Sequence, residues 1–205
     1  MGDFKIIYFD GGDGCGKTTQ LGLAKQSLEQ NGFKVFATRA LGGTPIGESL
    51  REVILGSATR PPQTDMHIAL ASQYALGAEL EKLQNIDVVL VDRSPLSIIA
   101  FQAYADKMDI GLAKTQVDII LSKMLPDLII VFDADAADLK DRRIHRNRHE
   151  GTDYFESKSI TYHQAVAEGY RAAAQDYSGH LIDATQSIEA VHQQTMQLIT
   201  PLLKT

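Results

Sequence analysis

Cysteine is almost absent from this chain, since Cys15 is the only one among 205 residues. An internal disulfide is therefore impossible, and the sequence indicates a reducing compartment rather than a disulfide-stabilised secreted protein. No apolar run is long enough to span a bilayer. The N-terminus also lacks the charged start and longer apolar region that mark a signal peptide. We therefore expect a cytoplasmic protein without a membrane anchor.

Positive charge is also scarce, with 20 basic against 26 acidic residues and a net charge of −6. Such a balance argues against nucleic acid as a partner, because duplex binding needs a broad basic surface. The six histidines show no zinc-ligand spacing, and no serine stands in a nucleophile-elbow context. Five basic residues nevertheless crowd into nine positions: Lys140, Arg142, Arg143, Arg146 and Arg148. This local cluster favours a small phosphorylated ligand.

The apolar pattern predicts strands that alternate with helices. The expected strands are 5–10, 33–38, 87–92, 128–132 and 180–183, and three of them are continuous apolar runs. The expected helices are 18–30, 46–55, 66–84, 95–106, 109–124, 134–146, 155–177 and 187–203. This order is typical of the P-loop type of α/β fold, a doubly wound, parallel, five-stranded sheet with helices on both faces. Without a linker or repeat, we expect one domain over residues 1–205.

Segment 11–18 fits G-x-x-x-x-G-K-[ST], the pattern of a phosphate-binding P-loop, between a predicted strand and a predicted helix. Its glycines let backbone N–H groups turn inward, beside the partial positive charge of a helix N-terminus. Lys17 is expected to reach the outer phosphates, and Thr18 to hold Mg²⁺. A glycine-rich turn without function would not explain the flanking strand and helix. The expected phosphate-binding residues are Gly11, Gly12, Asp13, Gly14, Cys15, Gly16, Lys17, Thr18 and Thr19. For Cys15, a low-pKa thiol at the helix start and a small filler are both open.

Other polar residues follow the ends of predicted strands, where ligands of such sheets bind. Asp92 is expected to assist the metal, and Arg93 offers a planar fork of donors to a second phosphate. The alternative for this pair is a strand-end ion pair. Arg39 reaches an anion at the sheet edge or is a solvated loop arginine.

The basic cluster allows two interpretations. A mobile lid would close arginines over the phosphates, because phosphoryl transfer needs positive charge and the exclusion of water. A basic helix C-terminus favoured by the helix dipole explains the same residues.

The ordered set of motifs resembles the thymidylate kinase (dTMP kinase) family over nearly the whole chain. Segment 9–20 resembles F-E-G-x-D-G-x-G-K-T-T-Q, and 38–44 resembles T-R-E-P-G-G-T. Segment 92–102 resembles D-R-Y-x-x-S-x-x-A-Y-Q, 153–156 resembles the D-R-x-E that ends the family's lid, and 182–184 matches a late I-D-A turn. A P-loop alone is shared by many families, whereas this set is specific.

The resemblance implies an enzyme that phosphorylates dTMP to dTDP by direct in-line transfer from ATP with Mg²⁺, usually as a homodimer. Lys17 and Thr18 would serve ATP and the metal, which Asp92 assists, and Asp13 would approach the acceptor's 3′-hydroxyl. The implied acceptor contacts are Asp13, Arg39, Gln73, Arg93, Ser97, Phe101 and Gln102, with Phe101 crowding a 2′-hydroxyl. The chain resembles the bacterial type, in which a lid over about 143–156 supplies arginine, here Arg143, Arg146 and Arg148.

The departures concentrate at the base pocket. The family's L-F-x-x-x-R stacks thymine on Phe and bonds it through Arg, whereas this chain has Ala69 and Gln73. Leu41 and Tyr74 are candidates to fill the gap. The acceptor is accordingly dTMP or, alternatively, another pyrimidine or a modified deoxynucleoside monophosphate. A nucleotide-dependent switch or regulatory P-loop protein is a third hypothesis, against which no D-x-x-G or N-K-x-D element follows the predicted strands.

Overall fold

The computed structural model describes residues 3–56, 59–139, 142, 154–155 and 157–203. Its centre is a five-stranded, wholly parallel sheet in the order β2-β3-β1-β4-β5. The strands are β1 (Lys5–Gly11), β2 (Val35–Arg39), β3 (Val88–Asp92), β4 (Leu128–Asp133) and β5 (His180–Asp183). β1 lies between β3 and β4, with Ile7 opposite Leu90 on one side and Leu128 on the other.

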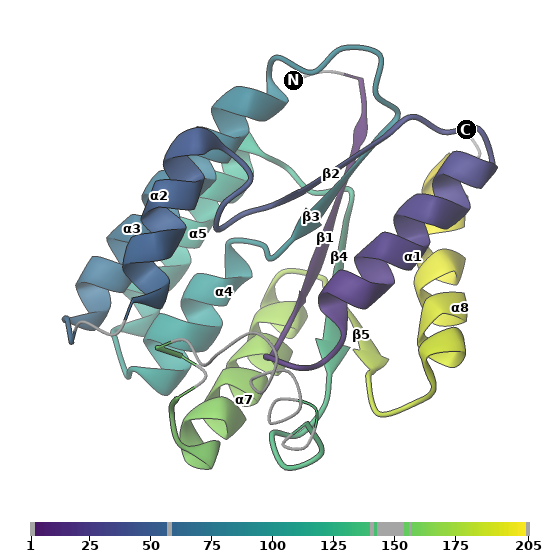
Figure 1. Ribbon diagram of the computed structural model, residues 1–205. Coiled ribbons are helices and arrows are strands. Elements are labelled where there is room, and N and C mark those ends of the chain that lie inside the picture. Colours follow the sequence, from purple (N-terminus) through teal and green to yellow (C-terminus); the bar gives the residue numbers. More distant parts are fainter. Residues whose placement is uncertain (1–2, 57–58, 140–141, 143–153, 156, 204–205) are drawn as a thin grey trace.

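Helices cover both faces of the sheet (Figure 1). One face carries α1 (Lys17–Gln30) and α8 (Ile188–Ile199), which continues into the 3₁₀-helix η2 (Thr200–Leu203). The elements on the other side are α2 (Pro45–Leu55), α3 (Pro62–Leu80), α4 (Leu96–Ile98), the π-helix η1 (Ile99–Ala105), α5 (Ile110–Lys123) and α7 (Ile160–Asp176). The predicted doubly wound architecture is confirmed.

The two apolar layers follow from the alternation of side chains along each strand. In β1, Ile7 and Phe9 pack with α1 and α8, whereas Ile6 and Tyr8 face the layer of α3, η1, α5 and α7. All four are almost fully buried. Burial on both faces explains why the central strands are continuous apolar runs in the sequence. Within the described residues, no helix has both the length and the apolar character needed to cross a membrane.

The predicted helix 66–84 is wrong at both ends, because α3 runs from Pro62 to Leu80. The helix starts earlier because a proline is well suited to the first helical position, where its missing N–H is not needed. Pro61 occupies the cap position before it. Asp65 lies inside the first turn, where its buried carboxylate pairs with Arg60.

Three further helix predictions need correction. The helix expected over 95–106 is a short α-helix followed by the π-helix η1, in which Asp106 N–H donates to the Phe101 carbonyl. Residues 134–139 contain turns rather than a helix, Arg142 is helical as predicted, and the rest of 140–146 lies outside the described residues. The helix expected from 155 begins at Ile160, because the Ser159 side chain caps it by accepting from Tyr162 N–H.

Candidate active site

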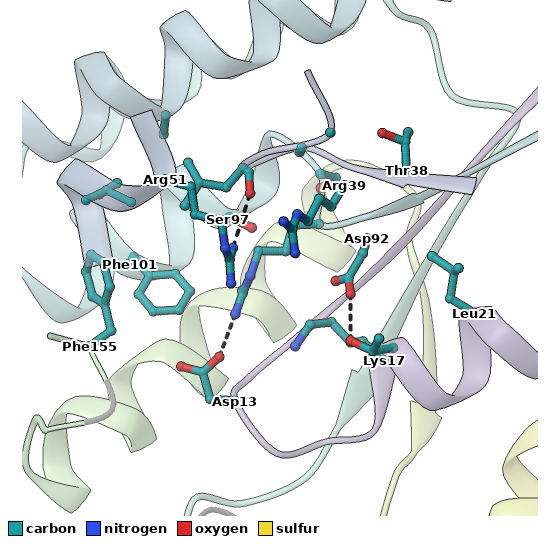
Figure 2. Close-up of a pocket in the computed structure, with 18 of the residues that line it drawn as sticks. Asp13, Lys17, Leu21, Thr38, Arg39, Arg51, Asp92, Ser97, Phe101 and Phe155 are labelled. Atoms are coloured by element: carbon teal, nitrogen blue, oxygen red, sulfur yellow. Dashed lines mark hydrogen bonds and ion pairs between the residues drawn. The ribbon is translucent and has the colours of Figure 1, made fainter. Parts of the chain in front are cut away.

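The carboxyl ends of β2 and β3, together with the loop that follows β1, border one cavity of about 1370 Å³. The P-loop and the start of α1 line one end through Asp13, Gly14, Gly16, Lys17, Thr18 and Thr19. The opposite end lies between α2, α3 and η1, where Figure 2 shows Arg51, Phe101 and Phe155. All seven residues expected to contact an acceptor line this same cavity: Asp13, Arg39, Gln73, Arg93, Ser97, Phe101 and Gln102.

The P-loop is bridged by its own lysine. Lys17 Nζ donates to the carbonyl oxygens of Gly11 and Gly12, both at 2.9 Å. Gly11 has a φ of +133°, and a Cβ there would lie 2.4 Å from the Phe132 carbonyl oxygen, so the loop requires glycine at this position. Gly11, Gly12 and Cys15 do not line the cavity, and they shape the loop from behind. Cys15 is buried, and burial raises the pKa of its thiol, which fits a space-filling side chain better than a reactive one.

Thr18 and Asp92 meet across the loop. The Thr18 hydroxyl donates to Asp92 Oδ2 at 2.8 Å, which joins the helix start to the end of β3 (Figure 2). Both oxygens are hard donors of the kind that Mg²⁺ prefers. Among the described residues no group of three or more His, Cys, Asp or Glu side chains gathers as a metal site. A magnesium ion here would therefore take its remaining oxygens from phosphate and water.

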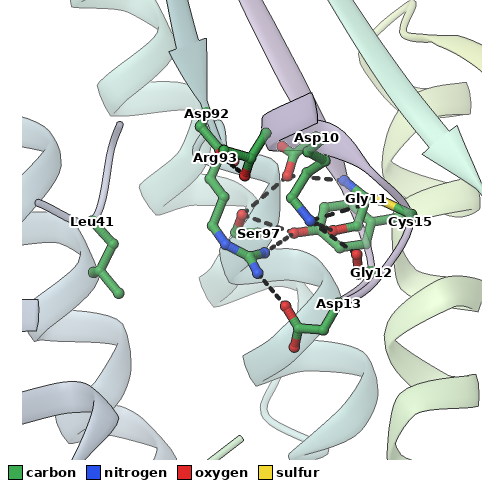
Figure 3. Close-up of polar contacts among 12 residues, drawn as sticks. Asp10, Gly11, Gly12, Asp13, Cys15, Leu41, Asp92, Arg93 and Ser97 are labelled. Atoms are coloured by element: carbon green, nitrogen blue, oxygen red, sulfur yellow. Dashed lines mark hydrogen bonds and ion pairs between the residues drawn. The ribbon is translucent and has the colours of Figure 1, made fainter. Parts of the chain in front are cut away.

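Arg93 is held from several sides. Its backbone is left-handed, with a φ of +72°, and its N–H donates to the Phe9 carbonyl. Its guanidinium pairs with Asp13 Oδ1 at 2.5 Å (Figure 3). It also donates to the Tyr170 hydroxyl at 3.0 Å and lies 5.3 Å from the Phe101 ring centre. A fixed fork of donors thus faces the cavity beside the P-loop. No sequence pattern indicated Tyr170, which reaches Arg93 from α7.

The buried carboxylate of Asp10 belongs to the hydrogen-bond network that reaches this arginine through Ser97 and Tyr170. Asp10 is fully buried and accepts from Ser94 N–H at 3.0 Å, the Ser97 hydroxyl at 3.2 Å and the Ser94 hydroxyl. Burial raises the pKa of Asp10, although Ser94 and Arg93 act in the other direction. Ser97 also shares a hydrogen bond of 2.9 Å with the Tyr170 hydroxyl. Ser97, predicted only as an acceptor contact, is therefore part of the support of Arg93.

Arg39 lines the cavity, but its guanidinium already has a partner. Arg39 Nη2 pairs with Glu48 Oε2 at 2.7 Å, and about half of each side chain is exposed. The Gly43 N–H and then the Arg39 guanidinium hold the pKa of Glu48 below its usual value. Neither alternative from the sequence describes Arg39 fully, because it is paired rather than solvated, and an anion would have to compete with Glu48.

The far end of the cavity is mostly apolar. Phe101 meets Phe155 edge-on, with ring centres 5.4 Å apart. Leu41 lines this end, whereas Tyr74 does not, because this residue is 44% exposed and its ring lies under Lys123. Of the two candidates to fill the gap, only Leu41 lies in place.

Two carboxamides and one arginine add polar groups to this end. Gln73 and Gln102 are 4% and 3% exposed, and the Gln73 amide oxygen has no hydrogen-bond partner among the described residues. Arg51, which the sequence reading missed, lines the cavity and donates to the Leu41 carbonyl at 3.1 Å. The positions 47, 51 and 54 lie on one face of α2, so helical spacing could have placed Arg51 beside the cavity.

The end of the expected lid contacts this part of the cavity. Tyr154 N–H donates to the Leu55 carbonyl at 3.1 Å, and the centre of its ring lies 4.8 Å from the Arg60 guanidinium and 3.9 Å from Lys158 Nζ. The three lid arginines, Arg143, Arg146 and Arg148, lie outside the described residues. Arg142 lines the cavity and donates to the Ala184 carbonyl at 2.9 Å.

Comparison with known proteins decides the family. The family model for thymidylate kinase matches residues 9–195. The chain belongs to the thymidylate kinase family. It is 33% identical to the thymidylate kinase of Halalkalibacterium halodurans, with 95% of each chain covered. It is 32% identical to that of Staphylococcus haemolyticus, over 97% of this chain and 98% of that one. A third relative, from Caldanaerobacter subterraneus subsp. tengcongensis, is 31% identical over 98% and 97%.

As a thymidylate kinase family member, the chain carries its family motifs at the P-loop end of the cavity and its departures at the far end. The loop, Thr18, Asp92 and Arg93 resemble the family motifs and come together in one place. At the far end, the expected base end, Ala69 and Gln73 stand where the resembled pattern has an aromatic residue and an arginine, and both line the cavity.

Proposed function

We propose that this chain transfers the γ-phosphoryl group of ATP to dTMP, forming ADP and dTDP. The observation that carries the proposal is the shared cavity, in which Lys17, Thr18 and Asp92 stand on the donor side and Asp13 and Arg93 stand between them and the base end. Two nucleotides that meet end to end at their phosphates would fit this order. The family membership supports the same reaction.

On the donor side, Lys17 would exchange its two loop carbonyls for the outer phosphates of ATP. Thr18 and Asp92 would hold Mg²⁺, since both present oxygen atoms at one point of the cavity. The bound ion would neutralise charge that develops on the phosphate oxygens.

On the acceptor side, Arg93 would hold the dTMP phosphate, with Arg39 as a second cation. Asp13 keeps the Arg93 guanidinium in place and would accept from the 3′-hydroxyl of the sugar. An oxygen of the acceptor phosphate attacks the γ-phosphorus, the bond from that phosphorus to the bridging oxygen breaks, and the electron pair leaves with ADP. Positioning and electrostatics supply most of the catalysis, so no covalent enzyme intermediate is needed.

Beyond the residues of this cavity, the lid and the organisation of the whole chain would contribute to the reaction. The lid arginines would close over the transferred phosphoryl group and exclude water. The chain would act as one nucleoside-monophosphate-kinase-like domain over residues 1–205, as a homodimer and in the cytoplasm.

The proposal is tested by measuring ADP release from ATP and Mg²⁺ with and without dTMP. We expect release that depends on dTMP and is lost in Lys17→Ala but kept in Lys25→Ala, which removes a half-exposed lysine of the same helix. ADP release at the same rate without any acceptor would favour the nucleotide-dependent switch instead.

A further inference from the structure

Gln73 presents a buried acceptor that nothing in the described part of the chain satisfies. The residue is 4% exposed, its amide oxygen has no hydrogen-bond partner, and it lines the base end of the cavity. Buried polar groups in proteins are nearly always paired, so an orphaned one at a cavity wall points to a ligand atom that donates to it.

A base that entered this end of the cavity would meet apolar side chains and two neutral carboxamides. Leu41, Phe101 and Phe155 are apolar, and the nearby Gln102 is a second buried carboxamide. Arg51 also lines this end, and its Nη1 already donates to the Leu41 carbonyl. At residue 73, a carboxamide stands where the family pattern has an arginine.

An amide and a guanidinium read the edge of a pyrimidine differently. A guanidinium only donates, so it suits the O4 acceptor of thymine or uracil and opposes the 4-amino group of cytosine. A carboxamide carries one acceptor beside two donors. It can pair with O4 and N3–H of a 4-oxo pyrimidine or, after a half-turn of the amide, with the 4-amino group and N3 of cytosine. The same logic lets Gln read adjacent donor and acceptor groups on adenine.

We propose that Gln73 widens the acceptor site to 4-amino pyrimidines, so that the enzyme phosphorylates dCMP as well as dTMP. This inference rests on the proposed kinase function. The reaction is balanced in the same way: an oxygen of the dCMP phosphate bonds to the γ-phosphorus of ATP, the bridging bond breaks, and ADP and dCDP form. No further reactant is required.

The test compares kcat/KM for dTMP and dCMP, with ATP and Mg²⁺, in the wild type and three variants. We expect wild-type values for the two acceptors within about tenfold of each other, since either edge makes an amide pair. Gln73→Arg should lower the dCMP to dTMP ratio by roughly tenfold to a hundredfold, the discrimination typical of one bidentate base contact. Gln73→Leu, which keeps the size and removes both polar groups, should lower both values and leave their ratio near that of the wild type. His67→Arg, an exposed change on the same helix, should alter neither value.

The outcomes separate the two proposals. Turnover of dTMP with a dCMP value more than about a thousandfold lower would overturn the wider acceptor range and leave the dTMP kinase function standing, because one missing hydrogen bond in a selective site costs that much or more. An unchanged ratio in Gln73→Arg would also overturn it. For a variant whose turnover is too slow to measure, equilibrium titration of each nucleotide without ATP gives the ratio of the two dissociation constants instead. If neither dTMP nor dCMP supports the release of ADP while ATP still binds, the proposed kinase function itself fails, and the inference fails with it.

Discussion

Tyr170→Phe tests the support of Arg93 by removing a single hydroxyl group. That hydroxyl accepts from Arg93 Nη1 at 3.0 Å and shares a hydrogen bond of 2.9 Å with Ser97, in a side chain that is 1% exposed. Phenylalanine keeps the ring, so no cavity forms and the change isolates the polar contacts. A hydrogen bond to a charged group contributes about 1.5–3 kcal/mol, and we expect the free energy of unfolding to fall by that amount. With Arg93 less firmly held, kcat/KM for dTMP should fall about tenfold, equivalent to roughly 1.4 kcal/mol of barrier.

Urea unfolding measures the loss, and Tyr177→Phe is the matched control. The Tyr177 hydroxyl donates to Asp118 at 2.8 Å in an exposed setting, where a substitution changes stability by only about 0.5 kcal/mol. Burial raises the pKa of Tyr170 far above its usual value, against the opposing effect of Arg93. Its contribution to stability is therefore fully present below about pH 10, the unfolded value, and is lost as the pH rises from there toward the folded-state pKa. The difference between wild type and variant should be constant from about pH 6 to 9. A Tyr170→Phe variant no less stable than Tyr177→Phe would refute the reasoning.

Four other outcomes are expected. Lys17→Ala and Asp92→Ala should each lower kcat by roughly 10²–10³ with unchanged thermal unfolding; a value within about threefold of wild type, some 0.6 kcal/mol of barrier, would contradict the assignment. Replacing the three lid arginines together should lower kcat more than it weakens ATP binding, whereas unaffected turnover would indicate a basic helix end. A bisubstrate analogue should protect residues 146–153 from protease cleavage. Cys15→Ala should keep its activity, and Cys15 should react slowly with iodoacetamide, because burial raises its pKa; rapid alkylation would contradict the burial. Ala69→Phe with Gln73→Arg should sharpen the preference for dTMP, measured as its kcat/KM relative to those of other pyrimidine monophosphates.

The parts of the fold that a local pattern specifies were predicted correctly. Continuous apolar runs marked the buried parallel strands, and the loop at 11–18 marked the point where the first strand meets its helix. Helix ends were less accurate where two signals competed, as at Pro62, which suits both a turn and a first helical position. The change to a π-helix at Ile99 has no counterpart in sequence periodicity, because its apolar residues also fit an ordinary helix.

The candidate site likewise has residues that a local sequence pattern predicts and contacts that no such pattern predicts. Lys17 and Thr18 became candidates through the spacing of the loop motif and Asp92 through its place at the end of a predicted strand, and the structure brings the three to one cavity. The strand order β2-β3-β1-β4-β5, and with it the contact of Tyr170 with Arg93, depends on pairing between segments far apart in the chain. No local spacing encodes such a contact. The unmet acceptor of Gln73 likewise becomes visible only once its burial is known.

The lysine bridge across the P-loop affects which ligands the loop retains. Because the Lys17 ammonium already has two carbonyl partners, a phosphate gains only the difference between a charged and a neutral acceptor. That difference grows with the charge of the incoming group, so the loop ranks ligands by phosphate number. A triphosphate should displace the carbonyls readily, a diphosphate less so, and a monophosphate hardly at all. The donor site would then release ADP after each transfer and leave monophosphates to the other end of the cavity.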